Sequence, residues 1–155
     1  MKKIKAYAIS ILISVATGAL SALATMGSMD IYSTINLPPL SPPSVLFPIV
    51  WSVLYVLMGI SAAMIYLSEA PTEDKVKALF TYGVSLFVNF FFSIFFFNMR
   101  MFLLSSFWVV LLWCLAFLTV IDYSKINKSA AYLQIPYLLW VTFASYLTIA
   151  ITVLN

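Results

Sequence analysis

The stretch LSPPSVLFPIVWSVLYVLMG, residues 40–59, holds three prolines and then an apolar run of helical composition. Proline inside a helix removes a hydrogen bond and clashes with the preceding turn, so we expect the helix to begin near Pro43, where the missing N–H costs nothing. Pro48 should then loosen the early turns. Trp51 and Tyr55 follow at steps of three and four residues, on the same helical face as Pro48. The stretch predicts an abrupt helix start with two aromatic rings aligned below it.

The composition of the whole chain places this helix in a membrane. Hydrophobic residues make up 64% of the 155 residues and charged residues 8%, and the mean hydropathy is +1.07. A soluble domain of this length has too little interior to bury so much apolar surface. Five apolar stretches are long enough to cross a hydrocarbon core about 30 Å thick, namely 4–26, 43–67, 76–98, 101–121 and 130–154. We predict an all-α membrane protein, one domain over residues 1–155, with a polar loop over 27–42 able to form a lid.

The first apolar stretch allows two interpretations. MKKIK followed by an apolar run and SALA resembles a secretory signal peptide, whose apolar core is usually about 7–15 residues long. The run here is longer, and it carries Ser10, Ser14, Gly18 and Ala22 at four-residue spacing. A stripe of small residues suits close helix packing in lipid. We therefore favour a retained membrane helix over a cleaved peptide.

Charge placement predicts the orientation in the membrane. The lysines lie at the start of the chain or in the loops after the second and fourth stretches, which a chain of five spans puts on one side: Lys2, Lys3, Lys5, Lys75, Lys77, Lys125 and Lys128. Only Arg100 and Asp30 lie on the other side. The positive-inside rule predicts a cytoplasmic N-terminus and an external first loop in a bacterial-type cell membrane. No basic patch lies elsewhere, so we expect no nucleic-acid partner.

Missing residue types narrow the chemistry. The chain has no histidine, and its one cysteine, Cys114, lies inside the fourth stretch, so we expect no metal centre, internal disulfide or tightly bound cofactor. The carboxylates at the ends of the stretches lie near lysines, where solvated ion pairs are expected: Glu69, Glu73, Asp74 and Asp122. No stretch holds a charge near its middle, which removes the usual signature of a proton relay or voltage sensor.

Asn89 lies among phenylalanines in SLFVNFFFSIFFFN. An amide in hydrocarbon needs a partner, which can be another helix or a ligand. At the helical rise, Trp51 and Asn89 lie about 12 and 14 Å below the external ends of their helices. We therefore expect the two side chains to face a common interior.

The fifth stretch carries Pro136, Trp140, Ala144 and Thr148 at four-residue spacing, on one helical face. Pro136 lies well inside the span and should bend the helix. A large ring beside a small residue indicates either tight packing or a slot for a ligand. Trp51 and Asn89 lie at a similar depth in the membrane, and this favours a ligand slot over tight packing.

Two other tryptophans have simpler interpretations. Trp108 lies within two turns of a predicted helix start, where membrane tryptophans usually form an interfacial belt. Trp113 lies deeper and is expected to face lipid or to fill space between helices.

Three segments together resemble the TspO family: the proline pair with FPIVWSVLYVLMG, VNFFFSIFF in the third stretch, and IPYLLWVTFASYL in the fifth. These are tryptophan-rich sensory proteins, whose mitochondrial relatives are called translocator protein or peripheral benzodiazepine receptor. The resemblance covers essentially the whole chain. It implies an antiparallel bundle of five transmembrane helices, commonly a homodimer, with a pocket beneath the first loop. It also implies binding of protoporphyrin IX and of isoquinoline carboxamide or benzodiazepine-type ligands.

Taken with the helical faces, the resemblance implies ligand-binding residues, with Tyr32 and Pro42 capping the site: Tyr32, Pro42, Trp51, Tyr55, Asn89, Phe90, Trp140, Ala144 and Thr148. Three positions depart from the family pattern. Leu40 replaces a tryptophan before the proline pair, Phe92 replaces a tryptophan, and Thr148 replaces an asparagine. These changes bear on ligand preference more than on fold. The loose cholesterol consensus VIDYSK lies away from the position used by animal relatives, so we infer no sterol binding.

Some bacterial members of the family are reported to promote light- and oxygen-dependent degradation of protoporphyrin IX. Without histidine, firm axial ligation of haem iron is disfavoured, so metal-free porphyrin is the expected ligand or substrate. Trp51 and Trp140 are then the candidate catalytic residues, because indoles are the most easily oxidised side chains nearby. Transport of porphyrins or other apolar ligands, and ligand-responsive sensing through the first loop, require the same pocket and are the alternatives.

Overall fold

The computed structural model describes residues 1–155 as a bundle of helices without strands. The long helices are α1 (Lys2–Thr25), α3 (Leu46–Tyr66), α4 (Thr72–Ser93), α5 (Phe102–Ile126) and α6 (Lys128–Leu154). Three short elements lie between them: η1 (Met26–Ser28), α2 (Ile31–Thr34) and a π-helical turn, η2 (Ile94–Asn98). Five helical segments, α4 being continued by η2, are long and apolar enough to cross a membrane. The predicted five-helix membrane protein is confirmed.

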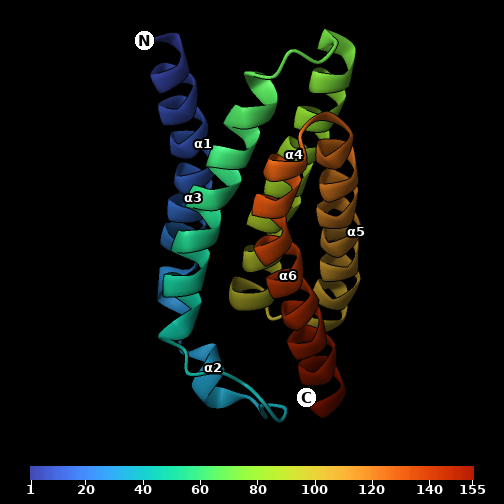
Figure 1. Ribbon diagram of the computed structural model, residues 1–155. Coiled ribbons are helices and arrows are strands. Elements are labelled where there is room, and N and C mark those ends of the chain that lie inside the picture. The colour runs from blue at the N-terminus through green and yellow to red at the C-terminus, as the bar shows by residue number, and fades with distance from the viewer.

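Successive long helices run in opposite directions, so the two ends of the chain lie at opposite ends of the bundle (Figure 1). Helix α1 packs against α3, α3 against α6, α6 against α5 and α5 against α4, and α4 closes the ring on α1. The segment between α1 and α3, which contains α2, crosses the end of the bundle near the end of α6 (Figure 1). We call residues 27–43 the lid, and this end of the bundle the lid end.

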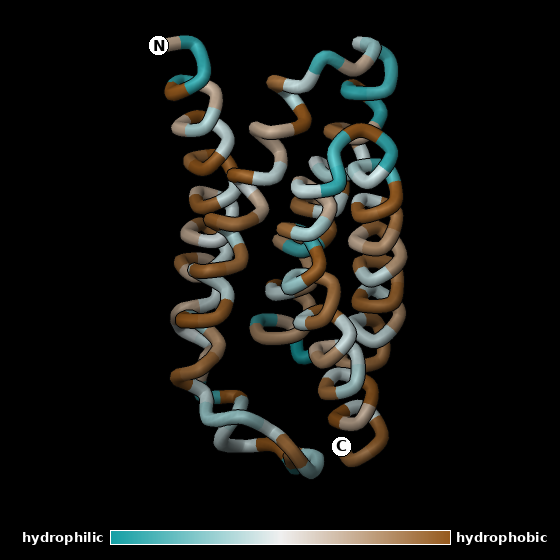
Figure 2. Tube along the Cα trace, in the orientation of Figure 1, coloured by the Kyte–Doolittle hydropathy of each residue, from teal (hydrophilic) through white to brown (hydrophobic).

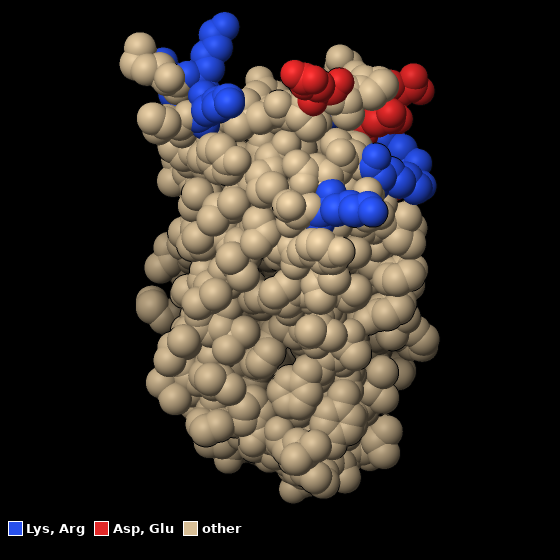
Figure 3. All heavy atoms as spheres, in the orientation of Figure 1, with Lys and Arg blue, Asp and Glu red and all other residues tan.

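Charge and hydropathy divide the molecule along its length. The middle of every long helix is predominantly apolar, and hydrophilic residues gather at the end opposite the lid (Figure 2). On the face drawn in Figure 3, all visible charged side chains lie at this second end, which we call the charged end. One expected ion pair forms there, with Lys77 Nζ 3.9 Å from Asp122 Oδ1. The placement of the charged end in the cytoplasm stays a prediction.

Two helix boundaries differ from the predictions because the apolar stretch and the helix are not the same segment. Helix α3 begins at Leu46 and not at Pro43, since the preceding residues form a turn in which Leu46 N–H donates to the Pro43 carbonyl at 3.0 Å. Pro48 therefore lies in the first helical turn, where N–H groups have no intrahelical acceptor, and the predicted loosening does not follow. Helix α5 continues to Ile126, beyond the predicted 121, because its last polar residues stay helical outside the hydrocarbon.

The predicted packing role of the small-residue stripe on α1 is confirmed. Ser10 Oγ donates to the Gly59 carbonyl of α3 at 2.7 Å, and Ser14 Oγ donates to the Tyr55 carbonyl one turn away. Gly18 lies directly under the Tyr55 ring, where an added Cβ would be 2.4 Å from a ring carbon. Small residues thus let the α1 and α3 backbones approach closely in the half of the membrane toward the charged end.

Buried polar side chains in the core pair across helices. Ser85 Oγ and Tyr137 Oη lie 3.1 Å apart between α4 and α6. Gln134 Nε2 donates to Ser61 Oγ at 3.2 Å between α6 and α3. Such bonds satisfy polar groups that lipid cannot, and each contributes about 0.6 to 2 kcal/mol in membrane proteins.

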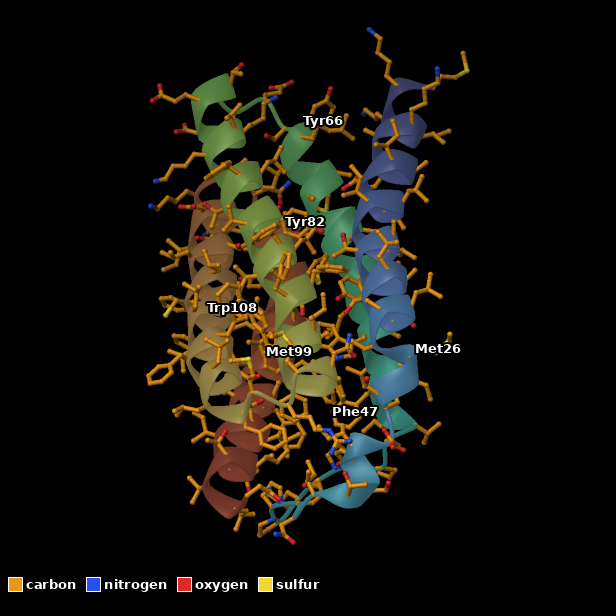
Figure 4. The ribbon with its side chains drawn as sticks, turned by 180° about the vertical axis from the view of Figure 1, so that it is seen from behind. Met26, Phe47, Tyr66, Tyr82, Met99 and Trp108 are labelled. Atoms are coloured by element: carbon orange, nitrogen blue, oxygen red, sulfur yellow. The ribbon has the colours of Figure 1, made fainter.

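Trp108 is not a belt residue. Its indole N–H donates to the Val88 carbonyl of α4 at 2.7 Å, and its ring packs edge-on against Phe95 at 4.9 Å. The ring therefore lies between α4 and α5 (Figure 4), because a carbonyl acceptor inside the bundle satisfies the N–H in place of the membrane interface. Trp113 stacks on Phe117 and donates to Thr142, as expected for a residue that fills space between helices.

Candidate functional site

A cavity of about 610 Å³ lies at the lid end of the bundle. Its walls come from α1, α3, the end of α4 with η2, and α6, and the lid contributes Met29 and Tyr32. No charged side chain lines it. Figure 4 shows Phe47 of the cavity wall just above the lid, and Met26 on the outer flank of α1. The cavity can therefore accept a largely apolar guest.

Six of the residues predicted from the sequence line this one cavity: Tyr32, Trp51, Tyr55, Trp140, Ala144 and Thr148. Pro42, Asn89 and Phe90 are not in its wall. The structure therefore brings together the two indoles and the small residue on α6, but it separates the α4 residues from them.

The two indoles occupy different aromatic surroundings. Trp51 is stacked on Tyr55, with ring centroids 5.5 Å apart and planes at 29°, and its N–H has no hydrogen-bond partner in the chain. Trp140 packs edge-on against Phe47 at 5.8 Å, and its indole nitrogen is buried without a partner. Stacked and edge-on rings at these separations are the favoured aromatic arrangements, so both indoles are held by packing and not by hydrogen bonds.

Asn89 lies behind the cavity wall and not in it. The side chain is 2% exposed, and its Nδ2 donates to the Tyr55 hydroxyl at 2.8 Å. Tyr55 fills the space between Asn89 and the cavity, because its ring extends from α3 between Trp51 and Gly18. The amide faces inward and has an interhelical partner, as expected, whereas its direct contact with a ligand stays a prediction.

Phe90 is displaced from the cavity by the geometry of α4. Its ring packs edge-on against Phe91 at 5.4 Å, on another side of the helix. The wall is instead formed by residues further along the chain, Phe92 and Ser93 and the η2 residues Phe96 and Phe97. The wider π-helical turn continues the phenylalanine run to the cavity, and such turns often occur at functional sites.

The lid is tied down at several points. Tyr32 Oη donates to the Pro42 carbonyl, so these two predicted capping residues do contact each other. Tyr146 of α6 donates to the Pro39 carbonyl at 2.8 Å. The Tyr32 ring packs edge-on against Phe47 at 5.6 Å, which links the lid to the cavity wall. Partial burial raises the pKa of the Tyr32 phenol above its usual 10.0, so it donates as a neutral group at pH 7.

Several wall residues were not predicted from the sequence, although some carried a signal. Phe47 lies one helical turn before Trp51, and Leu147 and Ile151 continue the face of Trp140 and Ala144, so extending the periodicity would have found them. The α1 wall was assigned to packing alone; it is formed by Gly18, Ala19, Ser21, Ala22, Leu23, Thr25 and Met26. Small residues that permit close helix packing also leave room for a cavity where the helices separate.

The fold and the site define a class: an integral membrane protein of five helices with a tryptophan-lined apolar cavity beneath a lid. The chain belongs to the TspO/MBR family, whose model matches residues 10–154. It is 35% identical over 124 residues to "Tryptophan-rich protein TspO" of Chlorobaculum tepidum, covering 80% of this chain and 78% of that protein. It is 30% identical over 149 residues to "Protein CrtK" of Rhodobacter capsulatus, with 96% and 92% covered. A protein of Archaeoglobus fulgidus, also named "Tryptophan-rich protein TspO", is 33% identical with 94% of both chains covered.

Proposed function

We propose that this membrane protein binds a flat, apolar tetrapyrrole, protoporphyrin IX, in the cavity beneath the lid. The observation that carries the proposal is a cavity of about 610 Å³ bordered by Trp51 and Trp140 and lined by no charged residue. Ligand pockets are usually about 300–1,000 Å³ and mostly apolar, with a few polar groups that orient the ligand. Aromatic faces suit a macrocycle, because flat π-systems stack on one another.

The polar groups in the wall support an oriented ligand. The Thr148 hydroxyl donates to the Ala144 carbonyl at 2.7 Å, so this donor already has a partner, and the Tyr55 hydroxyl accepts from Asn89 at 2.8 Å. The Trp51 N–H has no partner in the chain and can donate to a carboxylate on the edge of the ligand. One such bond would fix the orientation of the macrocycle while its apolar body is held by packing.

We extend the proposal to light-dependent degradation of the bound porphyrin, with dioxygen as the oxidant. Indoles are readily oxidised, and Trp51 and Trp140 are the tryptophans that line the cavity. They are therefore the residues proposed to exchange electrons with the excited pigment. No acid–base group is required for this step.

The test is titration of the purified protein in detergent with protoporphyrin IX, followed by tryptophan fluorescence, on wild type and on Trp51→Phe and Trp140→Phe. Each substitution should reduce the quenching amplitude and weaken binding. Trp113→Phe is the matched control, because Trp113 stacks on Phe117 outside the cavity. Saturable quenching that survives both substitutions unchanged would place the ligand elsewhere.

The same variants test degradation when illuminated with bound porphyrin in air. Bleaching should slow in Trp51→Phe and Trp140→Phe and continue in Trp113→Phe. Equal bleaching in all variants would remove the indoles from the mechanism. Porphyrin uptake into sealed vesicles, absent from protein-free vesicles, would instead support a transporter.

A further inference from the structure

The cavity wall is unequally exposed. On the side of α4 and α6 the wall residues are buried, with Phe92 9%, Thr148 3% and Ile151 2% exposed. The wall on the side of α1 is divided, because Ser21 and Thr25 are buried at 7% and 4%, whereas Leu23 and Met26 are 64% and 70% exposed. Because both groups border one cavity, the cavity reaches the outer surface of the bundle along α1.

The opposite rim of this opening is the start of α3. Ser44 and Pro48 line the cavity and are exposed. Toward the charged end, Ser10 and Ser14 bond α1 to α3, but on the lid side of Gly18 no hydrogen bond joins the two helices. We call this opening the lateral mouth; one rim is Leu23 of α1 and Met26 of η1, and the other is Ser44, just before α3, and Pro48 in its first turn.

The lid blocks the route from water. Asn36 N–H donates to Asn155 Oδ1 at 2.9 Å, and Asn155 Nδ2 donates back to the Asn36 carbonyl at 3.0 Å. Tyr146 holds the lid a second time through the Pro39 carbonyl. Entry through the lid requires these bonds to break, whereas entry through the lateral mouth breaks no hydrogen bond in the chain.

We propose that ligands enter and leave the cavity sideways from the lipid, through the lateral mouth, in the half of the membrane nearer the lid. This inference rests on the proposed function and narrows its ligand class to flat, apolar molecules that first dissolve in the bilayer. Partition into lipid concentrates such molecules beside the mouth, because burial of apolar surface is favourable. A strictly water-soluble ligand would have no access by this route.

The test uses single cysteines that can be blocked reversibly. In a Cys114→Ser background, Ser44→Cys and Met26→Cys place a thiol on either rim of the mouth, and each is labelled with a bulky methanethiosulfonate reagent. Leu20→Cys is the matched control, since Leu20 is on α1 and 58% exposed but does not line the cavity. Proteoliposomes are mixed with liposomes that carry protoporphyrin IX, and tryptophan quenching is followed by stopped flow.

Labelling either rim should slow association by about tenfold. Because Ser44 and Met26 also line the cavity, the readout is the association rate and not the equilibrium affinity. Reduction of the label should restore the rate, and labelled Leu20→Cys should behave as wild type. A freed-lid variant, Asn36→Ala, Tyr146→Phe, Asn155→Ala, removes the side-chain hydrogen bonds that hold the lid to the end of α6, and its entry rate should stay within about twofold of wild type. Faster entry in the freed-lid variant, with no effect of the rim labels on the association rate, would overturn the proposal. If unlabelled protein shows no saturable quenching, the result counts against the proposed porphyrin binding and not against the lateral route.

Discussion

Asn89 should act on ligand binding only through Tyr55, and a double-mutant cycle can measure this. Asn89→Ala removes the 2.8 Å hydrogen bond to the Tyr55 hydroxyl, whereas Tyr55→Phe removes the acceptor and keeps the ring. The Tyr55 ring is stacked on Trp51 at 5.5 Å, so loss of its anchor should loosen one wall of the cavity. An interhelical hydrogen bond in a membrane contributes about 0.6 to 1.7 kcal/mol. If the whole of that free energy is expressed in the ligand affinity, Kd should rise roughly threefold to twentyfold.

The assay is equilibrium quenching of tryptophan fluorescence by protoporphyrin IX in wild type, both single variants and the double variant. Because both substitutions break the same bond, Asn89→Ala should cost little further affinity in the Tyr55→Phe background. Ser61→Ala is the control, since it removes an interhelical bond to the Ala130 carbonyl away from the cavity and should lower stability without changing Kd. Additive losses in the double variant would show that Asn89 contacts the ligand directly, and would refute the arrangement described here.

Four further substitutions test the packing and the backbone. Gly18→Ala places a methyl 2.4 Å from the Tyr55 ring and should lower the free energy of unfolding by about 1–3 kcal/mol in thermal denaturation, whereas Gly83→Ala, with open space at its Cβ, should stabilise by up to about 1 kcal/mol. Leu40 has a φ of 70° and is 82% exposed, so Leu40→Gly should relieve about 1 kcal/mol of backbone strain and raise Tm without changing porphyrin affinity. Trp108→Phe loses its bond to α4 and should lower Tm while leaving Kd for porphyrin unchanged. Unchanged Tm in Gly18→Ala or in Trp108→Phe, or a lower Tm in Leu40→Gly, would contradict these assignments.

Much of the fold could be predicted because lipid imposes a simple rule. Every backbone polar group in hydrocarbon must be satisfied within the segment, so an apolar run of sufficient length becomes a helix. Helical periodicity then placed Trp51, Trp140, Ala144 and Thr148 on faces that do border one cavity. The predicted helix boundaries were less accurate, as at Pro43. A hydrophobic stretch indicates which residues lie in the membrane but does not show where the helix begins or ends.

The rest of the site depends on contacts that periodicity does not encode. The sequence indicates that Asn89 must face inward, but only the structure shows that the Tyr55 hydroxyl lies between it and the cavity. The π-helical turn at Ile94–Asn98 brings its own residues Phe96 and Phe97 to the cavity wall, and no residue type in the sequence predicts such a turn. The sequence also did not show that α1 lines the cavity. Gly18 and Ala22 are small residues, and small residues are compatible both with a contact between two helices and with a gap between them.

The size of the cavity limits how it can exist in a membrane. A cavity of about 610 Å³ left unfilled would deprive its apolar lining of contacts on one side, and protein interiors hold few voids larger than a water molecule. An opening to lipid removes the difficulty, because an acyl chain can occupy the space whenever a ligand does not. A porphyrin that enters by the lateral mouth would therefore exchange with lipid and not with water. Its affinity should fall as the acyl chains of the surrounding bilayer fit the cavity better.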